Sequence, residues 1–148
     1  MIGLVQRVGR CAVTVENQTI ASIGRGLLIM LGVHNEDYEK DLEVLARKCL
    51  GLRIFPDEQG KMNLSVTDVK GEIIVVSQFT LFGDVRRGLR PYFGDAASPE
   101  KANDYYEKFI AVLEKSGLNV QGGVFRAHMH VDILNDGPVT ISINTREL

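Results

Sequence analysis

Three polar side chains follow a short run of β-branched residues. Residues 73–76, IIVV, are β-branched, which is typical of a strand buried on both faces, and Ser77, Gln78 and Thr80 come directly after them. An unpaired polar group in the interior costs about 1–3 kcal/mol, so these side chains must find hydrogen-bond partners or face a cleft. They are therefore either ordinary hydrogen-bonded residues at a strand end or the polar wall of a site on a rigid strand.

A second unusual stretch, NDGPVT, occupies residues 135–140. Asp-Gly is a hairpin signal, but a proline directly after the glycine cannot donate a hydrogen bond to a strand ladder. The bond between Gly137 and Pro138 is either trans, as most X–Pro bonds are, or cis, as in some tight turns. The sequence leaves both isomers open.

Several familiar chemistries have no motif in this chain. It contains no G-x-S-x-G nucleophile elbow, no G-x-x-x-x-G-K-[ST] phosphate loop and no G-x-G-x-x-G dinucleotide fingerprint. His128 and His130 lie two residues apart and share the polar face of an expected strand with Asp132, and a solvated face explains them better than a metal site. We therefore expect neither a metal nor a cofactor.

Short strands and two helices must position these residues. A first helix is expected from about Glu36 to Leu50, with Asn35 as N-cap and Gly51 as the C′ glycine. A second helix begins at Ser98 as N-cap with Pro99 in its first turn. Strands are expected at residues 2–8, 11–16, 19–23, 27–33, 52–55, 73–76, 120–125, 128–134 and 139–143. The prediction is an α+β fold: one compact antiparallel β-barrel-like domain over residues 1–148, with two amphipathic helices packed outside.

Composition indicates an ordinary globular chain. Its 148 residues carry a net charge of −2, with 24% charged and 45% hydrophobic residues, which argues against disorder. No apolar run reaches the ~20 residues of a membrane span, and the N-terminus lacks the pattern of a signal peptide. Cys11 and Cys49 fall within expected elements and are interpreted as reduced core residues. We expect a cytoplasmic protein.

The two unusual stretches, SQFTL at 77–81 and NDGPVT at 135–140, together resemble the two signature motifs of the D-aminoacyl-tRNA deacylases, also called D-tyrosyl-tRNA deacylases. The resemblance also includes LVQRV at 4–8, FPDEQGKMNLSV at 55–66, RRGLRPYF at 86–93 and ASPEKA at 97–102. It implies a homodimer that hydrolyses the ester between a D-amino acid and the terminal ribose of tRNA. The chain departs from the family pattern at Phe82-Gly83 and at Arg126, beside the expected site.

The resemblance also implies a role for individual residues. The catalytic wall, which lines the pocket for the terminal adenosine and the ester, comprises Ser77, Gln78, Phe79 and Thr80. Gly137 and Pro138 match a Gly-cisPro dipeptide that reaches into the partner subunit's pocket and excludes an L side chain. The remaining substrate-binding positions are Arg7, which braces the dipeptide, Phe125 and Met129 in the pocket, and Asn135 and Thr140 beside the dipeptide.

Thr80 is a weak nucleophile without an adjacent base, and no histidine or carboxylate neighbours it in sequence. Our hypothesis is that the vicinal 2′-hydroxyl of the ribose assists an attacking water, while backbone N–H groups near Phe79 and Thr80 hold the oxyanion. Rejection by steric clash at Cβ predicts that glycyl-tRNA is cleaved as well.

A net charge of −2 is an objection to a tRNA partner, but Arg86, Arg87, Arg90 and Lys61 suggest a local basic rim. Two alternatives stay open. One is a non-catalytic tRNA- or nucleotide-binding module with this fold. The other is a related editing enzyme with a trans Gly-Pro bond and altered chirality or tRNA preference.

Overall fold

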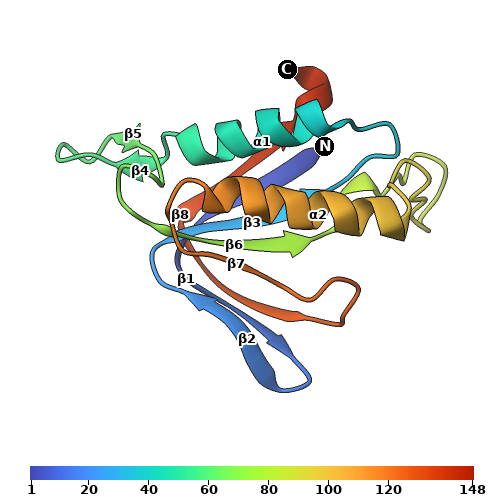
Figure 1. The fold of residues 1–148 in the computed structure, drawn as a ribbon, viewed down its shortest axis with the longest axis horizontal. Coiled ribbons are helices and arrows are strands. Elements are labelled where there is room, and N and C mark those ends of the chain that lie inside the picture. Colours follow the sequence, from blue (N-terminus) through green and yellow to red (C-terminus); the bar gives the residue numbers. More distant parts are fainter.

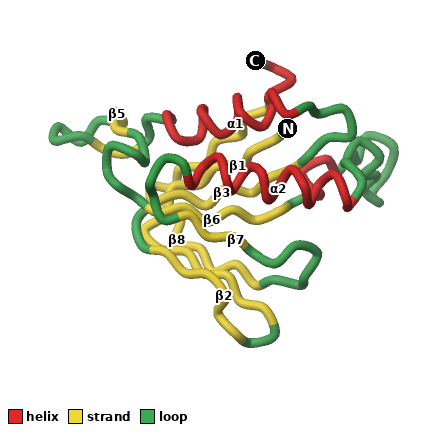
Figure 2. The backbone as a smooth tube through the Cα atoms, viewed as in Figure 1, coloured by secondary structure: helices red, strands yellow, loops and turns green.

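A computed structural model describes residues 1–148. Its main sheet has six strands in the order β2-β1-β3-β6-β7, with β8 paired to β1, and it curls into a nearly closed barrel (Figure 1). Helices α1 and α2 lie side by side over one face of this sheet (Figure 2). The strands are β1 (Ile2–Val15), β2 (Gln18–Ile23), β3 (Gly26–Gly32), β4 (Phe55–Pro56), β5 (Met62–Leu64), β6 (Glu72–Ser77), β7 (Val120–Gly122) and β8 (His130–Asn144). The helices are α1 (Glu39–Gly51) and α2 (Pro99–Glu114), with 3₁₀ turns η1 (Phe79–Phe82) and η2 (Thr145–Glu147).

The barrel-like class with two helices is confirmed, but the sheet is mixed. β1 pairs antiparallel with β2, β3 and β8, whereas β6 runs parallel to both β3 and β7. Parallel neighbours need a long crossover, and each helix lies in one of the two crossovers: α1 before β6 and α2 after it. The strand β6 is consequently buried on both faces, as its run of β-branched residues predicts.

Two long strands replace four expected short ones. β1 is continuous from Ile2 to Val15, and β8 is continuous from His130 to Asn144, although both had been predicted as two strands. The two strands pair along nearly their whole length, and their register shifts between Gln6 and Val8 and again between Val8 and Arg10. The NDGP segment is therefore an irregularity within a strand and not a turn between two strands. The predicted strand 120–125 ends earlier, at Gly122.

The two helices differ in how well their ends were predicted. In α2, the Ser98 hydroxyl accepts a hydrogen bond from the Lys101 backbone N–H at 3.3 Å and Pro99 is the first helical residue, as expected. The expected start of α1 was wrong, because the helix begins at Glu39 after Tyr38 and not after Asn35. Gly51 is also the last helical residue and not the residue beyond it. No helix of the structure has the length and apolar character that crossing a membrane requires.

Hydrophobic clusters occupy both faces of the sheet. Between the sheet and the helices, the buried α1 residues Leu42, Leu45, Ala46 and Cys49 pack in one cluster with α2 and with alternate residues of β3 and β6. Inside the barrel, a smaller cluster contains Cys11 and the residues of β6 that face the other way. Both cysteines are free and buried.

A side chain joins the two strands at the remaining gap of the barrel. The Gln121 side-chain amide on β7 accepts a hydrogen bond from the Ser22 backbone N–H at 2.9 Å and donates one to the Ser22 carbonyl oxygen, also at 2.9 Å. This pair of contacts repeats the donor and acceptor pattern of a strand ladder. It therefore links β2 to β7 where no backbone pairing does.

Candidate active site

A pocket of about 630 Å³ opens at the carboxyl end of β6. Ligands commonly bind at this end of parallel strands, and this volume lies within the usual range for small-molecule sites. Ten of the fifteen lining residues are hydrophobic. One wall comes from the end of β6, a second from residues 93–102 at the start of α2, and a third from residues 125–131 between β7 and β8.

Five of the residues that the sequence predicted for the pocket meet there. Ser77, Gln78 and Phe79 line it from the end of β6, and Phe125 and Met129 line it from the segment before β8. These two groups are far apart in the sequence, and the parallel pairing of β6 with β7 brings them together.

The segment after β6 turns sharply. The strand ends at Ser77, one residue beyond its expected end, and the 3₁₀ turn η1 begins at Phe79. The Gln78 backbone N–H still donates to the Leu31 carbonyl oxygen of β3 at 2.8 Å. Within the turn, Leu81 N–H donates to Gln78 O at 3.3 Å. The N–H groups of Phe79 and Thr80 are the first of the turn and therefore have no acceptor within it. Two backbone donors thus remain available beside the pocket.

Thr80 lies at the edge of this arrangement. It is exposed and does not line the pocket, and its hydroxyl is hydrogen-bonded to the Gln78 side-chain amide. Neither a histidine nor a carboxylate is bonded to it. The Thr80 oxygen therefore lacks the base that activates a hydroxyl nucleophile.

Tyr106 and Phe93 support these walls, although no role at the site was predicted for either. The Tyr106 hydroxyl donates to the Val75 carbonyl oxygen at 3.0 Å and lies 3.3 Å from that of Gly123, and burial raises the pKa of Tyr106 to about 12. Phe93 packs edge-on against Phe79, with ring centres 5.0 Å apart. The RRGLRPYF segment was a signal for Phe93, but Tyr106 had only the helical pattern of a core residue.

The dipeptide predicted for substrate binding belongs to a second cluster. Arg7 is only 9% exposed; its Nη1 donates to the Ile54 carbonyl oxygen at 2.6 Å and its Nε to the Asp136 carbonyl oxygen at 3.1 Å. The Gly137–Pro138 peptide bond next to this arginine is cis, and Gly137 has a φ of +126°.

Asn135 and Thr140 enclose the dipeptide segment. The Asn135 side-chain amide donates to the Thr140 hydroxyl at 3.0 Å, and its oxygen accepts from the Val139 backbone N–H at 3.2 Å. The segment is therefore fixed by side chains on both sides, while Gly137 and Pro138 themselves stay exposed.

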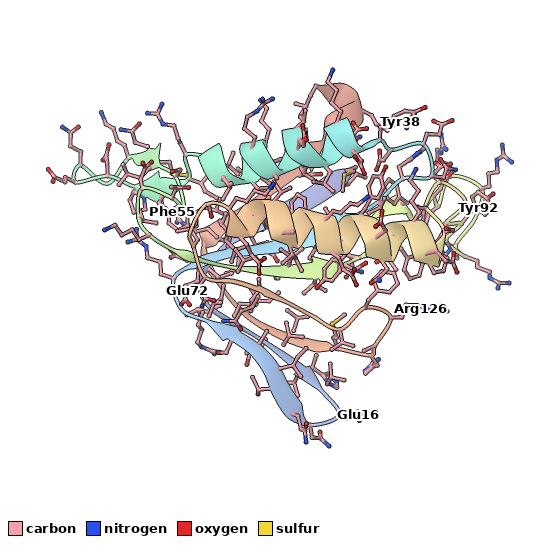
Figure 3. All side chains as sticks on the ribbon, in the orientation of Figure 1. Glu16, Tyr38, Phe55, Glu72, Tyr92 and Arg126 are labelled. Carbon is pink, nitrogen blue, oxygen red and sulfur yellow. The ribbon has the colours of Figure 1, made fainter.

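The two clusters are far apart within one chain. In the sheet, Arg7 is aligned with Leu27 and Ile73, whereas Ser77 is aligned with Leu31 and Gly3. The four-residue offset corresponds to about 13 Å along the strands. In Figure 3, the labelled Phe55, which follows the Ile54 bonded to Arg7, lies on the other side of the molecule from Arg126, which lines the pocket. Gly137 and Pro138 line no part of the pocket in their own chain.

The histidines near the pocket form no metal centre. The rings of His128 and His130 pack edge-on with centres 5.1 Å apart, and both side chains are exposed. No group of three histidine, cysteine, aspartate or glutamate side chains in the structure could hold a metal ion.

Comparison with known proteins gives consistent results over the whole chain. The profile of the family described as D-Tyr-tRNA(Tyr) deacylase matches residues 4–144. The D-aminoacyl-tRNA deacylase of Thermotoga petrophila is 55% identical over 148 residues, covering 100% of this chain and 99% of that protein. The corresponding protein of Dictyoglomus turgidum is 53% identical over 148 residues, covering 100% of this chain and 95% of that protein.

Two solved structures have the same fold. A c-Myc DNA unwinding element binding protein superposes with a TM-score of 0.92 at 45% identity, covering 97% of this chain and 98% of that one. A probable eukaryotic D-amino acid tRNA deacylase superposes with a TM-score of 0.81, covering 96% of this chain and 98% of that one. At 16% identity, the second likeness concerns the fold alone.

Proposed function

We propose a mechanism for this chain, which belongs to the D-Tyr-tRNA(Tyr) deacylase family. The chain is a D-aminoacyl-tRNA deacylase, that is, a hydrolase of aminoacyl-tRNA. In this mechanism, the pocket at the end of β6 binds the 3′-terminal adenosine together with its aminoacyl ester. The observation that carries the proposal is the convergence of SQF at 77–79 with Phe125 and Met129 around one cavity. The reaction belongs in the cytoplasm, where aminoacyl-tRNA enters translation.

The pocket walls suit an aminoacyl-adenosine. The apolar surface of the pocket and the edge-on pair of Phe79 and Phe93 offer contacts to the adenine ring, since aromatic side chains stack on any base. Ser77 and Gln78 add polar groups for the ribose and the ester. The protein supplies position and orientation, and neither a metal nor a cofactor takes part in the mechanism.

Water is the nucleophile in this mechanism. Its oxygen adds to the ester carbonyl carbon, assisted by the vicinal 2′-hydroxyl of the ribose, and the carbonyl oxygen becomes an oxyanion. The free N–H groups of Phe79 and Thr80 then stabilise that charge, at about 3–4 kcal/mol per donor in known cases. The oxyanion re-forms the carbonyl as the bond to the ribose 3′ oxygen breaks. That oxygen takes up the proton that the attacking water released, and the D-amino acid leaves. The Thr80 side chain positions Gln78 and forms no covalent bond to the substrate.

Chirality is decided by the dipeptide of a second subunit. Gly137 and Pro138 are exposed, lie about 13 Å along the strands from their own pocket and are held firmly by Arg7, so they are placed to act on another chain. They belong to β8, a 15-residue strand that pairs only with β1 and leaves its other edge open. In a homodimer, the dipeptide carbonyl oxygens meet the substrate's α-amino group and leave no room for an L side chain. Glycine has no Cβ, so glycyl-tRNA is also a substrate.

The test is to follow ester loss from one tRNA charged separately with D-tyrosine, L-tyrosine and glycine. We expect rapid loss of the D-tyrosyl and glycyl esters and survival of the L-tyrosyl ester. Survival of all three would favour a binding module that protects the ester, and loss of the L-tyrosyl ester would contradict rejection by the dipeptide.

A substitution of Thr80 distinguishes a positioning role of its side chain from a role as the nucleophile. We expect Thr80→Ala to retain measurable turnover of D-tyrosyl-tRNA, with Thr67→Ala, an exposed threonine in another loop, as the matched control. Complete loss of turnover in Thr80→Ala, with fold and tRNA binding intact, would make Thr80 the nucleophile.

A further inference from the structure

The loop after η1 leads to the wall of the pocket, and only its last residue, Phe93, has a place in the proposed mechanism. This rim loop, residues 84–93, follows η1 directly and ends at Phe93, which lines the pocket and packs against Phe79. At its start, the Gly83 N–H donates to the Thr80 carbonyl oxygen at 3.0 Å. Both ends of the rim loop are therefore attached to residues of the active site.

The rim loop has a defined base. Asp84 and Tyr92 form an antiparallel bridge in which each backbone N–H donates to the other residue's carbonyl oxygen, at 2.8 and 2.9 Å. The Asp84 carboxylate also accepts from Arg86 Nε at 2.9 Å and Nη2 at 2.8 Å, and this pairing lowers the pKa of Asp84 to about 2. The Arg86 charge is thus neutralised within the loop at any working pH.

Two further arginines of the rim loop are left unpaired. Arg87 and Arg90 are exposed and form no salt bridge and no side-chain hydrogen bond. Beside them, Leu89 is 100% exposed and Tyr92 is 69% exposed, so the loop combines free cations with uncovered apolar surface. The nearest other carboxylate along the chain is Asp95, which also forms no salt bridge.

The surroundings extend this surface across the pocket. Arg126 lines the pocket from the segment between β7 and β8, is exposed and has a left-handed φ of +63°. Figure 3 places the labelled Tyr92 and Arg126 at the same end of the molecule. The chain as a whole has a net charge of −2, so a polyanion is not attracted to its surface in general. A site for a polyanion must be local, and here Arg126 lines the pocket while Arg87 and Arg90 belong to the loop that ends at the lining residue Phe93.

We propose that the rim loop binds the single-stranded acceptor end of the tRNA, with Arg87 and Arg90 contacting phosphates that precede the terminal adenosine and Tyr92 stacking on a base. The inference rests on the proposed function, because it requires the terminal adenosine to occupy the pocket. Continuity with the pocket and charge complementarity select RNA as the occupant. Single strands are bound in this way, by cations along the backbone and aromatic rings against the bases.

The test compares two substrates of different length. One is D-tyrosyl-tRNA, and the other is 3′-O-(D-tyrosyl)adenosine, which fills the pocket but has no preceding phosphates. For the double variant Arg87→Ala/Arg90→Ala, we expect KM for the tRNA to rise about tenfold at 50 mM salt with kcat within twofold. The slope of log KM against the logarithm of the salt concentration should fall by about 1.4, since two phosphate contacts are lost and each single-strand contact contributes about 0.7. The short ester should be cleaved as by the wild type.

Arg47→Ala is the matched control, because Arg47 is an exposed and unpaired arginine on α1. The proposal is wrong if the double variant has the same KM and salt slope as Arg47→Ala. It is also wrong if the double variant loses activity equally toward the tRNA and the short ester. A third variant, Met129→Trp, fills the pocket and tests the proposed function separately. If it spares both substrates, the pocket assignment fails; if it abolishes both while the double variant spares both, only the RNA surface fails.

Discussion

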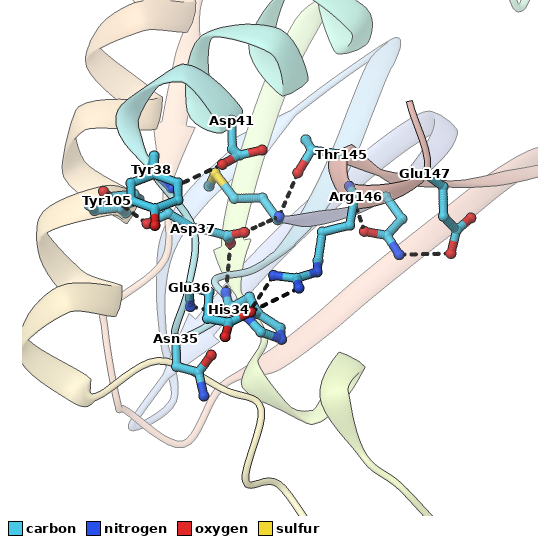
Figure 4. A network of polar contacts seen from close by, with 12 residues as sticks. His34, Asn35, Glu36, Asp37, Tyr38, Asp41, Tyr105, Thr145, Arg146 and Glu147 are labelled. Atoms are coloured by element: carbon cyan, nitrogen blue, oxygen red, sulfur yellow. Dashed lines mark hydrogen bonds and ion pairs between the residues drawn. The ribbon is translucent and has the colours of Figure 1, made fainter.

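Removing the charge of Asp37 should destabilise the protein more than any other single loss of an ion pair. The Met1 ammonium group donates to Asp37 Oδ1 at 2.7 Å and to the Thr145 hydroxyl at 2.7 Å, and the other carboxylate oxygen accepts from the His34 N–H at 2.7 Å (Figure 4). The exposed fractions of the Met1 and Asp37 side chains are 0% and 1%. The pair therefore lies out of reach of water, where either charge alone would be unsolvated.

The magnitude follows from this burial. Removing one partner of a buried ion pair costs about 3–5 kcal/mol, because the other charge is left uncompensated. Asp37→Asn keeps the shape of the side chain and one acceptor oxygen, so we expect about 3 kcal/mol, and Asp37→Ala should approach 5 kcal/mol. For a domain of this size these losses correspond to a fall in Tm of about 6–20 °C.

Removing the Asp37 charge should also disturb the wall of the pocket. His34 forms a backbone bridge with Ala96, and the Ala97 N–H donates to the Val33 carbonyl oxygen at 2.9 Å. Ala96 and Ala97 line the pocket, so loosening the His34 segment should lower kcat/KM for D-tyrosyl-tRNA in the same variant.

Urea denaturation of wild type, Asp37→Asn and a control measures the prediction. The control is Asp104→Asn, which removes an exposed carboxylate 2.9 Å from the Lys108 ammonium group and should cost no more than about 1 kcal/mol. A loss below 1 kcal/mol for Asp37→Asn would contradict this prediction, since it would mean that the ammonium group finds water in place of the carboxylate.

Three further predictions concern single positions. Gly137→Ala should lower the free energy of unfolding by about 1–3 kcal/mol, since the φ of +126° disfavours an L side chain and the added Cβ would lie 2.9 Å from Arg7 Nη2. In denaturation, Gly60→Ala should show a smaller loss, because φ there is +76° and no atom lies within 4 Å of the added Cβ. An equal loss in the two variants would contradict the role of the arginine. Burial raises the pKa of Cys49 from 9.0 to about 12, so the thiol's contribution to stability is complete below pH 9 and disappears as the pH rises toward 12. The difference in unfolding free energy between wild type and Cys49→Ala should therefore become smaller between pH 9 and 12. A difference that stays constant over this range would contradict the prediction. Gln121→Ala removes both contacts between β7 and β2 and should cost about 1–2 kcal/mol in urea denaturation, and a loss under 0.5 kcal/mol would show that the barrel stays closed without them.

Local features of the sequence were enough to predict several elements. The apolar run at 73–76 predicts a strand buried on both faces, because four β-branched residues in succession tolerate no solvated side. Ser98 and Pro99 predict the start of α2, because a hydroxyl cap and a fixed φ act on the first turn alone. Two short motifs also predicted the family, which the comparisons confirm.

Other features depended on contacts between distant residues. Asn35 has the chemistry of an N-cap, but α1 starts after Tyr38, and Asp37, inside the helix expected there, is bonded to Met1 and His34. The NDGP segment has the local signals of a turn, but pairing with β1 along β8 keeps it within a strand.

Residue types and their near neighbours were enough to identify the chemically unusual residues, because polarity, backbone freedom and capping are local properties. The grouping of those residues in space depends on the fold of the whole chain. Parallel pairing of β6 with β7 places Phe125 and Met129 beside Ser77, while the register of β1 places Gly137 about 13 Å along the strands from that site. Strand order and register are long-range choices fixed by the burial of whole faces, and no short segment of the chain contains them.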